Sequence, residues 1–107
     1  MLPTVTDETF TEKVLMSTKP VLVKFTADWC QPCKVMSETL RDLTPELGDH
    51  VRFVEVDIEK DPDLANQFGV RGLPTLMLFK SGQVLANMNG LSPKPKIRSW
   101  IIDQLGL

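Results

Sequence analysis

The sequence has no tyrosine, one histidine and two cysteines among its 107 residues. It lacks internal repeats and low-complexity tracts, and its longest apolar runs, such as LMLF, have only the length of a strand. A membrane-spanning helix needs about 20 apolar residues, so we expect no membrane partner. The net charge is only −2, with acidic and basic residues interspersed, so nucleic acid is not an expected partner either.

The length and composition are those of a small globular protein. A chain of 107 residues predicts one domain, residues 1–107, that folds around a single core as a monomer. The first residues, MLPTVTDETF, lack the basic start and long apolar stretch of a secretory signal, which favours a cytoplasmic location. Stable disulfides are rare in the cytoplasm, so a cysteine pair there is more often catalytic or metal-binding.

The hydrophobic patterning predicts an α/β fold. The apolar runs VLVKFTA and VRFVEVDI favour central strands, and TLMLFK and VLANMNG, joined by a turn at KSGQ, predict an antiparallel hairpin. Helices are expected near Phe10 and Val14, from the cysteines to about Gly48 with Val35 facing inward, over DPDLANQFG, and at the end of the chain after a Ser92 cap. This order predicts a mixed sheet between layers of helices.

The stretch DWCQPCK places Cys30 and Cys33 three positions apart, and three kinds of site are open to them. A structural zinc site needs four ligands, and His50 is the only other candidate of the usual type, so we expect no metal. A purely structural disulfide that closes so short a loop contributes only about 2 kcal/mol of stability. The third kind is a redox pair that opens and closes.

The redox interpretation accounts for the arrangement of the residues. A strand ends in a turn and a helix begins at Cys30, where free backbone N–H groups and the positive end of the helix dipole stabilise a thiolate. Cys33 lies about one helical turn further on, within reach of a disulfide and more deeply buried. Pro32 suits the first turn because it has no N–H group to leave unpaired, and Lys34 adds a nearby cation.

Three motifs give the chain a family resemblance. The segments ADWCQPCK, VRGLPTLMLFKSGQ and NGLS occur in the order and at the spacing seen in thioredoxins, and the chain resembles that family over essentially its whole length. The resemblance implies a thioredoxin-like three-layer sandwich, with a central mixed sheet of four to five strands flanked by four helices.

The resemblance also implies the role of single residues. Trp29 would border the disulfide, and Pro74 would be a cis proline that faces the two sulfurs, after a Leu73 that offers backbone groups to an extended substrate chain. The expected substrate groove consists of Trp29, Gln31, Pro32, Gly72, Leu73, Pro74, Gly90 and Leu91.

The function implied is dithiol–disulfide exchange with protein substrates, with Cys30 as nucleophile and Cys33 as resolving cysteine. No cofactor is expected beyond the Cys30–Cys33 pair itself, which an NADPH-dependent flavoprotein, a thioredoxin reductase, would reduce again. The alternative is a thioredoxin-fold scaffold or interaction subunit whose cysteines are dispensable. A glutaredoxin-like function is weaker, because no glutathione-binding set is evident in the sequence.

The chain departs from the family at four places. Gln31 replaces the usual glycine after the first cysteine, which predicts a stiffer turn and a shifted redox potential. Thr26 replaces a second tryptophan, and Glu38 replaces a helix-kinking proline. Lys24 stands where the family buries an aspartate, and Glu55 stands where it commonly has a lysine.

The exchanged charges suggest a hypothesis for proton transfer. Lys24 and Glu55 would form an ion pair behind Cys33, in which Glu55, or a water that it orders, takes the proton of Cys33 while the charge of Lys24 favours the thiolate. In the alternative, Lys24 extends to a wet end of the sheet and Glu55 is an ordinary strand residue.

Overall fold

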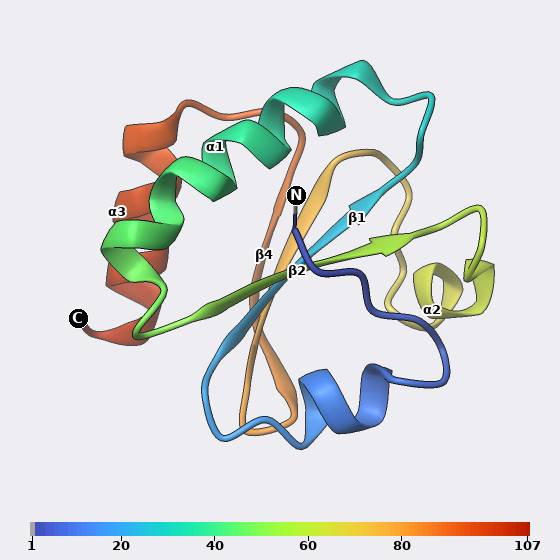
Figure 1. Cartoon of the computed structure of the whole chain (residues 1–107), viewed down its shortest axis with the longest axis horizontal. Helices are drawn as coiled ribbons and strands as arrows, with labels where there is room; N and C mark the ends of the chain where they lie inside the picture. The colour runs from blue at the N-terminus through green and yellow to red at the C-terminus, as the bar shows by residue number, and fades with distance from the viewer. Residues whose placement is uncertain (1) are drawn as a thin grey trace.

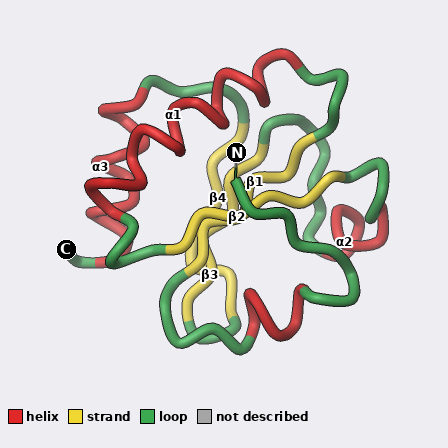
Figure 2. The backbone as a smooth tube through the Cα atoms, in the orientation of Figure 1, coloured by secondary structure: helices red, strands yellow, loops and turns green. Residues whose placement is uncertain are grey.

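Two parallel strands and an antiparallel hairpin form one mixed sheet in the computed structural model, which describes residues 2–107 (Figures 1 and 2). The strands are β1 (Val21–Thr26), β2 (Arg52–Asp57), β3 (Thr75–Lys80) and β4 (Gln83–Asn89), and their order across the sheet is β2-β1-β3-β4. β1 runs parallel to β2 and antiparallel to β3, which pairs antiparallel with β4. From residue 2 onward, the N-terminal segment adds one isolated bridge to this sheet, between Thr4 and Glu55.

The helices cover both faces of this sheet. α1 (Gln31–Leu47) and α3 (Lys94–Leu105) lie on one face, and the short π-helix η1 (Thr11–Leu15) and α2 (Pro62–Gln67) lie on the other (Figure 1). The predicted α/β three-layer fold, with a mixed sheet of four to five strands flanked by four helices, is therefore confirmed, and residues 2–107 contain four strands in the sheet. Within residues 2–107, no helix has the length and apolar character that crossing a membrane requires.

Strand β1 divides the core into two clusters, because its side chains alternate between the faces. Leu22 packs with residues of α1 and α3, while Val21, Val23 and Phe25 pack with η1 and α2. Lys24 belongs by this alternation to the face of Leu22, under α1, and only 2% of it is exposed. A charged residue thus occupies a position that apolar side chains fill elsewhere on that face.

Helix α1 begins and ends close to the predicted residues. Cys30 is its N-cap, Pro32 lies in its first turn, and Pro45 is accommodated before Gly48 at the C-cap. Met36 is buried, but Val35 is 44% exposed, so its predicted place in the inward stripe is wrong. Each residue turns the helix by about 100°, which carries Val35 out of the arc that faces the sheet.

The predicted cap of the last helix is also wrong. The N-cap of α3 is Pro93, and no side chain, Ser92 included, caps the helix by a hydrogen bond. Pro93 has an extended backbone (ψ 151°), and its carbonyl accepts hydrogen bonds from the N–H groups of Lys96 and Ile97. The proline in the first turn is therefore Pro95.

The β3–β4 hairpin closes with the two residues Ser81 and Gly82, which have φ values of 54° and 79°. Positive φ at both positions is the requirement of a type I′ turn, whose twist matches that of the strands. A Cβ atom added to Gly82 would lie 2.9 Å from the carbonyl oxygen of Leu15, so η1 approaches the turn closely.

We expect Gly82→Ala to lower the free energy of unfolding by about 1–3 kcal/mol in urea denaturation, because it combines a left-handed backbone with a backbone clash. Gly69→Ala is the matched control, since Gly69 has φ +68° but no atom within 4 Å of an added Cβ. Equal losses of unfolding free energy in the two variants would mean that the close approach of the added Cβ atom to the Leu15 carbonyl oxygen does not destabilise the protein.

Candidate active site

The two cysteines lie where strand β1 gives way to helix α1. The N–H group of Cys30 donates to the carbonyl of Ala27 at 3.1 Å, which closes the turn between the two elements. Cys30 and Cys33 form a disulfide with a Cα–Cα distance of 5.3 Å. Both are buried, and Ala27, Ile58 and Leu73 surround them with apolar side chains.

The first turn of α1 prepares Cys30 for a negative charge. As N-cap, Cys30 accepts a hydrogen bond at its sulfur from the N–H group of Cys33, at 3.2 Å. In the reduced protein the same N–H group and the helix dipole stabilise a thiolate at this position. The geometry therefore supplies a nucleophilic sulfur and, one turn later, a second sulfur that reaches it.

Trp29 is held beside the disulfide by two acidic residues that the sequence analysis did not single out. Its side chain is 67% exposed, and its Nε1 donates to Oε1 of Glu59 at 2.6 Å. Glu59 in turn is positioned by Asp57, whose Oδ1 accepts from the N–H group of Glu59 at 2.8 Å. The signal was available, because VDIEKD places acids directly after the strand that neighbours β1.

The loop before β3 faces the disulfide from the other side. The Leu73–Pro74 peptide bond is cis, which is the isomer that the resemblance implied. The hydroxyl of Thr75 donates to the carbonyl of Gly72 at 2.7 Å, and the N–H group of Gly90, at φ +81°, donates to the carbonyl of Pro74 at 2.8 Å. These two bonds fix the loop and attach it to the end of β4.

A groove of about 540 Å³ runs beside the disulfide between α1 and this loop. Of the predicted groove residues, five line it: Trp29, Gln31, Pro32, Gly72 and Leu73. Ile58, Val70 and Arg71 also line it and were missed by the sequence analysis.

Three predicted groove residues do not line this hollow. Pro74 and Gly90 are joined to its wall through the loop, and Leu91, which is 50% exposed, lies in a separate hollow with Val35 and Pro93. The hollow beside the disulfide is thus lined by five of the eight predicted groove residues.

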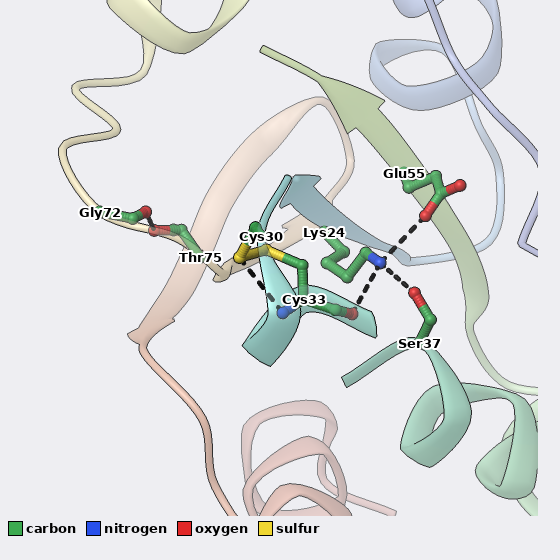
Figure 3. Close-up of a disulfide and its surroundings, with 7 residues drawn as sticks. All are labelled: Lys24, Cys30, Cys33, Ser37, Glu55, Gly72 and Thr75. Atoms are coloured by element: carbon green, nitrogen blue, oxygen red, sulfur yellow. Dashed lines mark hydrogen bonds and ion pairs between the residues drawn. A yellow bond between two sulfur atoms is a disulfide. The ribbon is translucent and has the colours of Figure 1, made fainter. Parts of the chain in front are cut away.

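Lys24 lies beneath the first turns of α1 and holds three acceptors at once (Figure 3). Its Nζ is 3.0 Å from Oε2 of Glu55 and donates to the carbonyl of Cys33 at 3.2 Å and to the hydroxyl of Ser37. Glu55 is the direct partner of Lys24 in the parallel pairing of β1 and β2, which explains why the two charges meet. The alternative of a Lys24 that extends into water does not fit its 2% exposure.

His50 lies far from the cysteines. It follows the C-terminal end of α1, and a 17-residue helix is about 25 Å long, whereas Cys30 caps the other end. The two sulfurs bind each other, and among residues 2–107 no group of three histidine, cysteine, aspartate or glutamate side chains is arranged to hold a metal ion.

Comparison with known proteins agrees with the geometry. The family model described as Thioredoxin matches residues 1–103. A thioredoxin of Rhodospirillum rubrum is 42% identical over 97 residues, which cover 91% of this chain and 93% of the relative. A thioredoxin of Rickettsia bellii is 37% identical over 105 residues (98% and 100%), and thioredoxin 1 of Synechococcus elongatus is 42% identical over 101 residues (94% of each).

Proposed function

The chain belongs to the thioredoxin family and is a thiol–disulfide oxidoreductase, and we propose that it reduces disulfide bonds of other proteins through Cys30 and Cys33. The observation that carries the proposal is the position of the cysteine pair. Cys30 caps a helix beside an open groove, and Cys33 lies within bonding distance one turn later.

The exchange takes two steps. The Cys30 thiolate attacks one sulfur of the target disulfide, so that a Cys30–target bond forms and the other target sulfur leaves as a thiolate. The Cys33 thiolate then attacks the Cys30 sulfur, which forms the Cys30–Cys33 disulfide and releases the second target sulfur. Two electrons pass from the protein to the target, and the two target thiolates take up protons from water.

The groove supports an extended target chain. Its floor is apolar where Ile58, Val70 and Leu73 lie, and Gln31 and Arg71 add polar groups. The backbone of Leu73 would bind the target chain, and Trp29 would border it. This arrangement holds a segment in front of Cys30 without demanding one particular side-chain sequence.

The remaining assignments rest on family membership. We propose that an NADPH-dependent thioredoxin reductase returns the disulfide to the dithiol, that no further cofactor takes part, and that the protein acts in the cytoplasm as a monomer. The scaffold function gains no support from the site, since each element of an exchange centre is present around Cys30.

We expect Cys33→Ser to trap the target as a stable mixed disulfide with Cys30, because the second step then lacks its nucleophile. The adduct would be seen as a band on a non-reducing gel that dithiothreitol removes, after mixing the reduced variant with a disulfide protein such as insulin. The control Cys30→Ser/Cys33→Ser should form none. A Cys33→Ser variant without any adduct would overturn the assignment of Cys30 as nucleophile.

A further inference from the structure

Lys24 is the one lysine among residues 2–107 that is buried. Its ammonium group has one acceptor for each of its three N–H donors. An ammonium group has three N–H donors and no acceptor. Three acceptors meet it: the carboxylate of Glu55, the hydroxyl of Ser37 and the carbonyl of Cys33. The full set of partners holds a positive charge directly against the backbone of the resolving cysteine.

The carboxylate of Glu55 lies beyond this charge. Figure 3 shows the Lys24 nitrogen between the Glu55 carboxylate and Cys33. Among residues 2–107, no hydrogen bond joins the side chain of Glu55 to Cys33, and Glu55 is 18% exposed where Lys24 is 2% exposed. The group nearest to Cys33 is thus the cation, and the anion anchors it.

A polar pocket of about 270 Å³ opens beside the pair. Besides Lys24 and Glu55, the charged groups that line it are Asp28 from the turn before α1 and Lys34, Glu38 and Arg41 from α1. The two acids and two bases of this set cancel formally, as do Lys24 and Glu55, so the sign of the field at Cys33 depends on which charge lies closest, and that charge is Lys24. The pocket reaches Lys24, Ser37 and Glu55, so water can approach the ion pair that holds the Cys33 carbonyl.

We propose that Lys24 is a positioning residue for the second step: anchored by Glu55 and Ser37, it holds the Cys33 carbonyl and stabilises the Cys33 thiolate, whose proton passes to water. The inference rests on the proposed function. In the step itself, Cys33 loses its proton to water, its sulfur bonds to the Cys30 sulfur, and the Cys30–target bond breaks with both electrons leaving on the target sulfur.

Lys24→Met tests the charge while it keeps most of the side chain's length. An opposite charge at close range changes the ionisation equilibrium of a group about tenfold or more, so the variant should show about a tenfold lower thiolate fraction in ultraviolet titration of the reduced protein. Lys80→Met is the matched control, because Lys80 is exposed at the far end of β3.

The redox equilibrium with glutathione, measured from pH 5 to pH 9, distinguishes an electrostatic effect of Lys24 on the thiolate from a purely structural effect of the substitution. As the thiols ionise toward pH 9, Lys24→Met should progressively reduce the equilibrium constant for forming the dithiol, by up to about tenfold, equivalent to about 30 mV. At pH 5 both dithiols are protonated, and the two proteins should differ less than about twofold. A difference that is the same at every pH would mean a purely structural role and would overturn the proposal.

Glu55→Gln gives the opposite expectation, and it keeps the proposal testable if Lys24→Met does not fold. The glutamine amide keeps an oxygen that accepts from Lys24 but removes the negative charge, so the thiolate fraction should rise and the mixed disulfide should resolve at least as fast as in the unaltered protein. If Glu55 is instead the base for Cys33, resolution slows and the proposal is wrong. Since these comparisons require an unaltered protein that reduces disulfides, failure of that reaction would count against the proposed function instead.

Discussion

Replacing Cys30 by serine is expected to abolish disulfide reduction, so that insulin is reduced no faster than by dithiothreitol alone. A serine hydroxyl is not ionised at neutral pH and forms no disulfide, so neither step of the exchange can take place. The measurement is the reduction of insulin disulfides in the presence of dithiothreitol, followed by the turbidity of the released chain. This is the largest effect expected from any single substitution in the chain.

The control for Cys30→Ser is the reduced form of the unaltered protein, because both lack the disulfide. Their unfolding curves in urea should agree within about 0.5–1 kcal/mol, since a hydroxyl at the N-cap still accepts the Cys33 N–H group. Activity that persists in Cys30→Ser would remove the enzyme assignment and favour the scaffold. Loss of activity with an intact fold leaves exchange chemistry as the function of the site.

Much of the active site was predictable from the sequence because its parts are local. The spacing of Cys30 and Cys33 and the proline between them define a helix start whatever the rest of the chain does. The meeting of Lys24 and Glu55 was predicted from the positions that the family resemblance matched, and the parallel register of β1 and β2 makes them direct partners.

The parts that were missed depend on contacts between distant segments. Glu59 reaches Trp29 across 30 positions of the chain, and nothing in either local segment requires it. Ser37 became the third partner of Lys24 because α1 crosses β1 at that point. Leu91 was placed in the groove by analogy, whereas the start of α3 gives it a hollow of its own.

Phe79→Ala is expected to cost about 3–5 kcal/mol of unfolding free energy, a large part of the total of about 5–15 kcal/mol that such a domain possesses. Phe79 is 1% exposed, and its ring meets those of Phe10 and Phe68 edge-on, at centroid distances of 5.6 and 5.2 Å. Removing it opens a cavity where η1, α2 and β3 converge. Urea denaturation of the variant measures the loss.

Val84→Ala is the matched control, because Val84 pairs with Phe79 across the hairpin but is 42% exposed. This substitution should lower the free energy of unfolding by less than about 1 kcal/mol.

The side chains of Phe79 and Lys24 lie on opposite faces of the sheet, so Phe79→Ala should leave the redox equilibrium with glutathione unchanged at every pH. We expect Phe79→Ala to lose stability with an unchanged redox potential, and Lys24→Met to show an altered redox potential. Together these results would show that the cluster of Phe10, Phe68 and Phe79 stabilises the fold, whereas Lys24, on the other face of the sheet under α1, controls the cysteines electrostatically. A loss below about 1 kcal/mol in Phe79→Ala would mean that Phe10 and Phe68 close the cavity by themselves.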